Sequence, residues 1–172
     1  MTTRLNLGKI GIWTWTLDAQ PMPAAREAVQ ELEELGFNTV WIPEAVGREP
    51  FAHAGILLSA TKNLILATGI ASMYARTAAT MQAGQKTLTS AFPERFLLGI
   101  GASHGHMVKS LHKTAYVKPY SSLVGYCLAG LVSHCDEKVV HRVGYVLGVG
   151  VRLPFVCEHG GRGSVLGLGG KD

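Results

Sequence analysis

The sequence predicts an α/β fold built on a parallel sheet, and three observations lead to this prediction. Strand-like and helix-like stretches alternate through residues 1–120, with one pair about every 25 to 32 residues, as in parallel βαβ units. The predicted strands are continuous apolar runs, which indicates that both faces of the sheet are covered. Hydrophobic residues make up 47% of the 172 residues, enough for the core of one domain. These patterns fit a barrel wall and a doubly wound sheet equally.

The first strand–helix unit covers residues 10–36. Ile10 to Leu17 is a run of Ile, Trp and Thr that is typical of a strand. Pro21 and Pro23 favour a helix start, and Gly36 favours its end. Between them, apolar residues recur at helical spacing and predict one buried face: Ala25, Ala28, Val29, Leu32 and Leu35.

Three further strands and two helices follow. The apolar runs that predict strands are bounded by turn residues, and the helices carry apolar residues on one side. In chain order, these elements are a strand at 40–42, a helix from about Pro50 to Thr61, a strand from Leu64 to Ile70, a helix from Thr77 to Phe92 and a strand from Phe96 to Ile100.

The carboxyl ends of the strands are where a parallel barrel places its chemistry. They fall at 13–16, 44–47, 69–72 and 101–104. Trp13 and Trp15 alternate onto one face of the first strand. Either one of them flanks a bound ring, or both belong to the core.

Four segments at these strand ends carry a family resemblance. They are IGIWTWTLD, WIPEAVGREPF, LILATGIASMYARTAATM and FPERFLLGIGASH. They resemble the luciferase-like flavin and deazaflavin oxidoreductases, most of all an actinobacterial F420-dependent branch, and F-P-x-R-F-x-L-G-x-G is the most specific motif. The resemblance implies the first four βα units of a TIM (β/α)8 barrel. Because a complete barrel takes roughly 250 residues, residues 1–120 are expected to form its N-terminal half only.

The resemblance implies a coenzyme-binding bulge after the third strand. In the family, this strand ends in a non-proline cis peptide bond that supports the middle ring of the coenzyme. The matching residues here are Gly69, Ile70 and Ala71. The alternative is that Gly69 only turns the chain out of the strand.

An acidic residue, Glu44, ends the second strand, where relatives keep an acid near the ring. Its carboxylate can accept hydrogen bonds there. The alternatives are a solvated loop acid or a partner for Arg48. Relatives that use a histidine as proton donor place it one residue later, but Ala45 stands at that position, so this general acid is missing.

Ser103 and His104 end the fourth strand, where the family contacts coenzyme and substrate. The backbone N–H groups of Ala102 and Ser103 are suited to holding a ring carbonyl. Histidine is the side chain most often used for acid–base chemistry near neutral pH, so His104 is the candidate for proton transfer. The alternative is a solvated loop histidine.

Two competing kinds of site have little support. The glycines of Gly99–Gly105 echo a dinucleotide-binding loop, but no acid follows about 20 residues later to hold a ribose. The spacing of His104, His106 and His112 fits no helical ligand pair, so no metal is expected.

The implied function is hydride transfer between F420 and a small organic substrate. One alternative is an FMN-dependent luciferase-like monooxygenase, and another is an inactive fragment that only self-associates, for instance as a homodimer. Basic residues are dispersed, which argues against a nucleic-acid partner. Without a signal-peptide pattern or an apolar run of about 20 residues, no membrane association is expected and the cytoplasm is the expected location.

Residues 121–172 lose the strand–helix rhythm. Glycine crowds the chain end, and all three cysteines (Cys127, Cys135 and Cys157) lie here without zinc or disulfide spacing. This Gly/Val-rich segment is either a divergent, flexible tail or the product of a reading-frame change. Because four strands cannot close a barrel, the first and fourth strands are expected to be open edges, and the phosphate-binding half of the site is expected to be absent.

Overall fold

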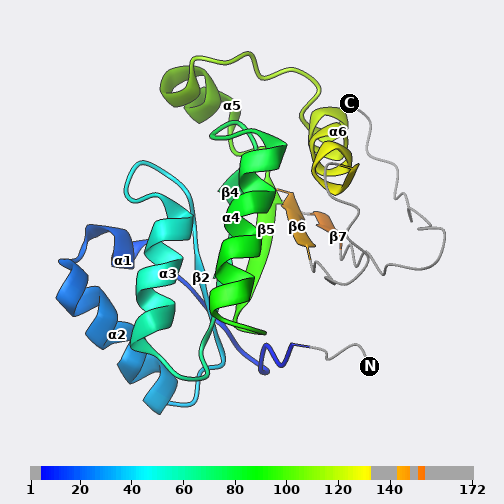
Figure 1. The fold of residues 1–172 in the computed structure, drawn as a ribbon. Coiled ribbons are helices and arrows are strands. Elements are labelled where there is room, and N and C mark those ends of the chain that lie inside the picture. Colours follow the sequence, from blue (N-terminus) through cyan, green and yellow to red (C-terminus); the bar gives the residue numbers. More distant parts are fainter. Residues whose placement is uncertain (1–4, 133–142, 148–150, 154–172) are drawn as a thin grey trace.

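Residues 5–132, 143–147 and 151–153 are described in a computed structural model of the chain, whose course Figure 1 shows. The strands are β1 (Ile12–Trp13), β2 (Thr39–Ile42), β3 (Ile65–Thr68), β4 (Ala71–Ser72), β5 (Phe96–Gly101), β6 (Val143–Leu147) and β7 (Val151–Leu153). The helices are α1 (Thr16–Ala19), α2 (Met22–Glu34), α3 (Pro50–Ala60), α4 (Ala78–Ala91), α5 (Gly105–Met107), the π-helix η1 (Val108–His112) and α6 (Pro119–Val132). None of the helices in these ranges is long and apolar enough to cross a bilayer.

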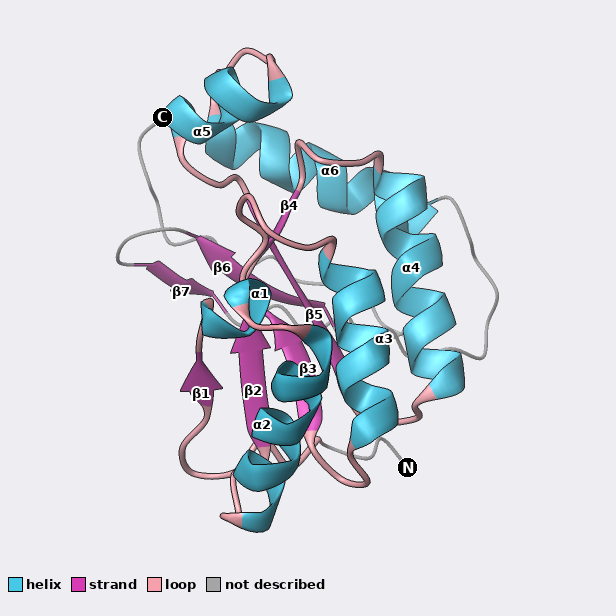
Figure 2. Ribbon diagram, turned by 90° about the vertical axis from the view of Figure 1, so that its left-hand side faces the viewer, coloured by secondary structure: helices cyan, strands magenta, loops and turns pink. Residues whose placement is uncertain are grey.

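The strand order follows the chain order. The sheet runs β1-β2-β3-β5-β6-β7, and all neighbours are parallel except β7, which is antiparallel to β6. Figure 2 shows α2, α3 and α4 together on one face of this sheet. A doubly wound sheet would reverse its strand order and place helices on both faces, whereas a barrel wall does neither. The predicted partial barrel is therefore confirmed.

The core lies between the helices α2, α3 and α4 and alternate residues of the sheet. Side chains at these positions are almost completely buried: Val29, Val40, Ile42, Ala54, Leu57, Leu58, Leu66 and Leu98. The predicted α2 stripe holds as far as the partly buried Leu32. Leu35 is 67% exposed because it is the C-cap, after which Gly36 takes a positive φ of 84° and ends the helix as predicted.

The first predicted strand is mostly wrong. Only Ile12 and Trp13 pair with β2, and Thr16 already begins α1. The Thr14 hydroxyl accepts the Thr16 N–H at 3.1 Å and lies 2.7 Å from the Thr16 hydroxyl. Such local side-chain bonds compete with a strand ladder, so the chain leaves the sheet two residues after β1.

The sheet continues past the predicted four strands. The predicted fourth strand is β5, and β6 pairs with it in parallel. The prediction that this strand is an open edge is therefore wrong. The predicted boundary at residue 120 falls in the first turn of α6, whose Leu123 is buried in the core. Of the predicted tail, 121–172, the described residues are 121–132 in α6 and the strands β6 and β7. The remainder lies outside the described residues, and the origin of the tail stays a prediction.

The most specific motif of the sequence stabilises the fold far from the strand ends that carry the predicted site. Arg95 precedes β5 at the amino-terminal end of the sheet. Its guanidinium donates to the carbonyl oxygens of Leu58 and Leu64, both at 3.1 Å, and to the Thr61 hydroxyl at 2.6 Å. These bonds fix the turn that leads from α3 into β3.

A buried histidine joins α1 to α3. His53 Nδ1 lies 3.1 Å from Asp18 Oδ1, while Nε2 is buried with no hydrogen-bond partner among the described residues. Burial lowers the pKa of His53 below its ordinary value of 6.5; Asp18 raises the pKa and the charge of Arg48 lowers it. The folded protein therefore holds this imidazole neutral more firmly than the unfolded chain does.

Acidification should weaken the fold through His53. Because the folded pKa is depressed, the unfolded chain binds more protons as the pH falls through 6.5, and the free energy of unfolding falls with it. Urea unfolding at a series of pH values should show this slope in the wild type and in His106→Gln, which changes an exposed histidine. His53→Gln should lose part of the slope, and a slope equal to that of the wild type would contradict this account.

Candidate functional site

A bulge separates β3 from β4 at the carboxyl end of the sheet. The peptide bond between Gly69 and Ile70 is cis, as the family resemblance implied. The Gly69 N–H donates to the Ile42 carbonyl at 2.8 Å, and the Ile70 carbonyl accepts the Glu44 N–H at 2.9 Å. The backbone at the end of β2 therefore holds the bulge on both sides of the cis bond.

The bulge exposes only part of the predicted ring-binding set. Gly69 and Ile70 are half-buried and reach the surface. Ala71 has no exposed surface and pairs with β5 behind them. Of the three residues, the first two can offer surface to a ligand, and their binding of a coenzyme stays a prediction.

Glu44 is engaged by neighbouring segments of the chain. Its carboxylate accepts the Ser72 N–H at 2.7 Å and Arg76 Nη1 at 2.9 Å, and its second oxygen pairs with Arg76 Nη2. The side chains of Glu44 and Arg76 are only 12% and 10% exposed. Arg48, the predicted alternative partner, instead donates to the carbonyl oxygens of Leu17 and Gln20.

Arg76 is the residue that sequence reasoning missed. It also pairs with Glu49 Oε1 at 3.2 Å and lies 5.0 Å from the centre of the Phe51 ring. Its carbonyl accepts the Tyr126 hydroxyl at 2.9 Å, and burial raises the pKa of Tyr126 to about 12, so this donor stays protonated. A cation just before a helix is unfavourable for the helix dipole, and that position was the one available signal that Arg76 has a specific acidic partner.

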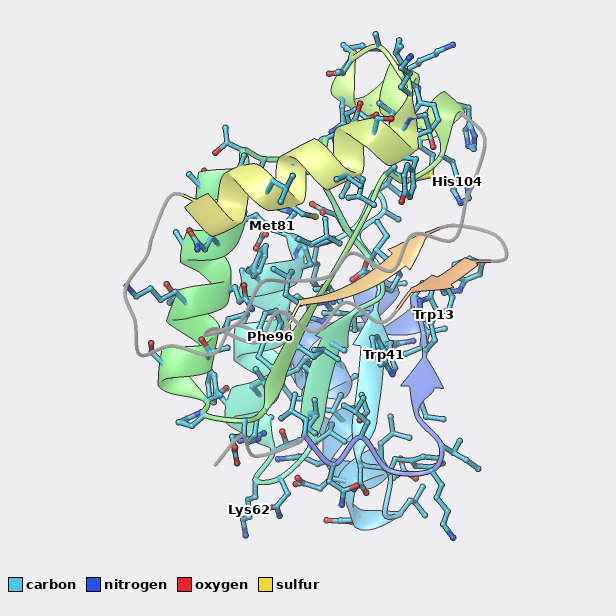
Figure 3. The ribbon with its side chains drawn as sticks, turned by 90° about the vertical axis from the view of Figure 1, so that its right-hand side faces the viewer. Trp13, Trp41, Lys62, Met81, Phe96 and His104 are labelled. Atoms are coloured by element: carbon cyan, nitrogen blue, oxygen red, sulfur yellow. The ribbon has the colours of Figure 1, made fainter. Side chains whose placement is uncertain are left out.

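Ser103 and His104 lie in the loop after β5. Ser103 has a positive φ of 58°, and its carbonyl accepts the Tyr116 hydroxyl at 3.2 Å. His104 is exposed, and its ring stacks on that of His106 with 6.1 Å between centroids. Figure 3 shows His104 above the sheet, apart from Trp13 and Trp41.

Two tryptophans stand beside the bulge. The Trp13 indole N–H donates to the Gly69 carbonyl at 2.6 Å, and Trp13 and Trp41 are the side chains that a Cβ at Gly69 would meet. Of the two alternatives for Trp13 and Trp15, a position in the core is excluded, because their side chains are 54% and 66% exposed. Their rings still meet edge to face at 5.9 Å.

Three residues at these strand ends form a partly exposed surface beside the bulge. This surface combines the half-buried Gly69, whose N–H and carbonyl are both hydrogen-bonded, the half-buried apolar side chain of Ile70 and the exposed indole of Trp13. Flat aromatic ligands bind to apolar and aromatic surfaces with a few polar backbone groups. Glu44 and Arg76 pair with each other next to the bulge, so their charges are not directed to a ligand at this surface.

Comparison with known proteins identifies the chain's relatives. Residues 8–126 match the family model described as luciferase-like monooxygenase. A Mycobacterium tuberculosis protein, provisionally named a coenzyme F420-dependent oxidoreductase, is 29% identical over 120 residues, which are 69% of this chain and 33% of that protein.

Two solved structures share the fold. An F420-dependent secondary alcohol dehydrogenase, solved with an F420–acetone adduct, has a TM-score of 0.55 at 22% identity and matches over 62% of this chain and 36% of its own. The oxygenating constituent of 3,6-diketocamphane monooxygenase from Pseudomonas putida, a type II Baeyer–Villiger monooxygenase solved with FMN, has a TM-score of 0.57 at 14% identity, over 71% of this chain and 38% of its own. The chain spans about a third of the length of these relatives.

The Glu44–Arg76 pair should be a large contributor to stability. Arg76→Ala leaves a buried carboxylate without its cation, which is expected to lower the free energy of unfolding by about 3 kcal/mol. Glu49→Gln is the matched control, because Glu49 contacts the same guanidinium but is half exposed, and it should cost less than about 1 kcal/mol.

Urea unfolding of both variants measures the difference. The double variant Glu44→Gln with Arg76→Met leaves no charge at the buried pair and frees only the half-exposed Glu49. Its loss should therefore be smaller than the sum of the losses of Glu44→Gln and Arg76→Met measured singly. An equal decrease in the free energy of unfolding for Arg76→Ala and Glu49→Gln would show that the buried pair contributes no more to stability than the half-exposed one.

Proposed function

The chain belongs to the luciferase-like monooxygenase family, and from this premise we propose that it carries the ring-binding part of an F420-dependent oxidoreductase site. The observation that supports this most is the Gly69–Ile70 bulge, which is open to the surface at the carboxyl end of β3 and flanked by Trp13. The F420-dependent relatives named above favour the deazaflavin over other ring ligands.

The proposed reaction is hydride transfer between F420 and a small organic substrate. When bound, the coenzyme would itself accept or donate the hydride. Gly69 and Ile70 support one face of its ring, and the backbone at Ser103 positions its edge. Glu44 acts indirectly by holding the bulge through Ser72 and Arg76. His104 is the proposed proton donor or acceptor at the substrate oxygen, since Ala45 cannot serve.

An FMN-dependent monooxygenase is the second candidate, favoured by the structural similarity to the FMN-bound enzyme. The two coenzymes present similar planar ring faces, so the described surface suits both. A third candidate is an inactive chain that only self-associates. Binding of F420, binding of FMN and binding of neither coenzyme distinguish the three candidates.

Fluorescence titration of F420, with FMN in parallel, tests the proposal on the folded protein. Saturable F420 binding is expected, and Gly69→Ala should weaken it about tenfold, or about 1.4 kcal/mol. The physical reason is that a Cβ at Gly69 would lie 3.0 Å from Trp13 Cδ1 and push the indole aside.

Gly125→Ala is the control, because a Cβ there meets nothing within 4 Å. It should bind F420 like the wild type. Binding of FMN alone would transfer the proposal to a monooxygenase, and a folded protein that binds neither coenzyme would reject both enzymatic functions.

The role of His104 is tested by turnover. With F420 and isopropanol as the first substrate pair, His104→Gln should lower the rate about 100-fold, as expected for the loss of an acid–base group, and leave F420 affinity unchanged. His106→Gln, which changes the stacked neighbour, should keep the wild-type rate. Equal rates for both variants would remove His104 from the mechanism.

A further inference from the structure

We propose that Trp13 is a positioning residue of the coenzyme site, which holds the bulge by hydrogen bonding and forms a wall beside the bound ring. This inference rests on the proposed function. The sequence pattern left open whether Trp13 or Trp15 flanks a bound ring or both belong to the core, and it assigned Trp13 no contact with the bulge.

A hydrogen bond joins Trp13 to the bulge. The Trp13 indole N–H donates to the Gly69 carbonyl at 2.6 Å, while the Gly69 N–H donates to the Ile42 carbonyl at 2.8 Å. Gly69 is thus held through both of its backbone polar groups, one by the neighbouring strand and one by a side chain. Because β1 and β3 are separated by β2 in the sheet, the indole reaches across a whole strand to make this bond.

The packing around the Trp13 indole allows it to extend across β2. Trp13 and Trp41 both pack close to Gly69, and two glycines stand where a Cβ would press on one of the two rings. A Cβ at Gly11 would lie 3.0 Å from Trp41 Nε1, and a Cβ at Gly69 would lie 3.1 Å from Trp13 Nε1 and 3.4 Å from Trp41 Cβ. Figure 3 shows Trp13 and Trp41 next to each other at this end of the sheet.

The Trp13 indole is also exposed to solvent. Trp13 is 54% exposed although its N–H is bonded, so much of the ring remains available beside the half-buried Gly69 and Ile70. Trp15 meets it edge to face at 5.9 Å. An indole whose N–H is hydrogen-bonded has a fixed orientation and offers a flat apolar surface, which suits a planar ring better than a mobile side chain would.

Phenylalanine substitutions separate this role from a general aromatic one. Trp13→Phe keeps an aromatic ring and removes the N–H that holds Gly69. Trp15→Phe is the matched control, because Trp15 is also exposed and aromatic but the bond to Gly69 comes from Trp13. Titration with F420 should show at least a tenfold larger dissociation constant for Trp13→Phe and less than a twofold change for Trp15→Phe, with urea unfolding confirming that both fold.

A second readout does not depend on the folding of Trp13→Phe. In the Trp15→Phe protein, bound F420 should protect the fluorescence of the remaining exposed indole, Trp13, from quenching by acrylamide. Two results would overturn the role of Trp13 and leave the proposed function standing, provided that the wild type binds F420. One is equal F420 affinity of Trp13→Phe and Trp15→Phe, and the other is acrylamide quenching that F420 does not change. Failure of the wild type to bind F420 would reject the proposed function and this inference with it.

Discussion

The buried ion pair between Glu44 and Arg76 is the interaction on which the carboxyl end of the sheet depends. It joins the end of β2 to β4 and to the start of α4, and its carboxylate also accepts the Ser72 N–H at 2.7 Å. Neither charge is tolerable alone in a site that is about nine-tenths buried, because an unpaired buried charge is far less stable than the same charge in water. The two residues therefore fix three chain segments relative to one another.

The surface next to this pair is built from backbone and apolar groups. Main-chain bonds from Ile42 and Glu44 hold the bulge, and the indole of Trp13 holds it from the side. This division explains why a glycine, rather than a charged residue, stands at the centre of the proposed site. The polar groups beside it supply rigidity, and the Gly69–Ile70 surface remains suited to a flat ring.

The sequence predicted the elements that have strong local signals. β2, α3, α4 and β5 lie close to their expected positions, because continuous apolar runs and one-sided helices are local patterns. The bulge at Gly69 was expected only through family resemblance. Arg76 was missed because its partner Glu44 lies 32 residues away in the chain, and β6 was missed because strand pairing is non-local and its segment carries no periodic signal. The first strand was overpredicted, since Thr14 and Thr16 bond locally instead.

A crystal structure of the protein with F420 would test the central claim most directly, namely that the Gly69–Ile70 bulge is the surface that receives a coenzyme ring. We expect the ring to lie against Gly69 and Ile70 with one edge beside Trp13, and the Glu44–Arg76 pair to remain intact next to the bulge. A ring bound elsewhere, or a Glu44 carboxylate released from Arg76 to bind the ring, would contradict this account.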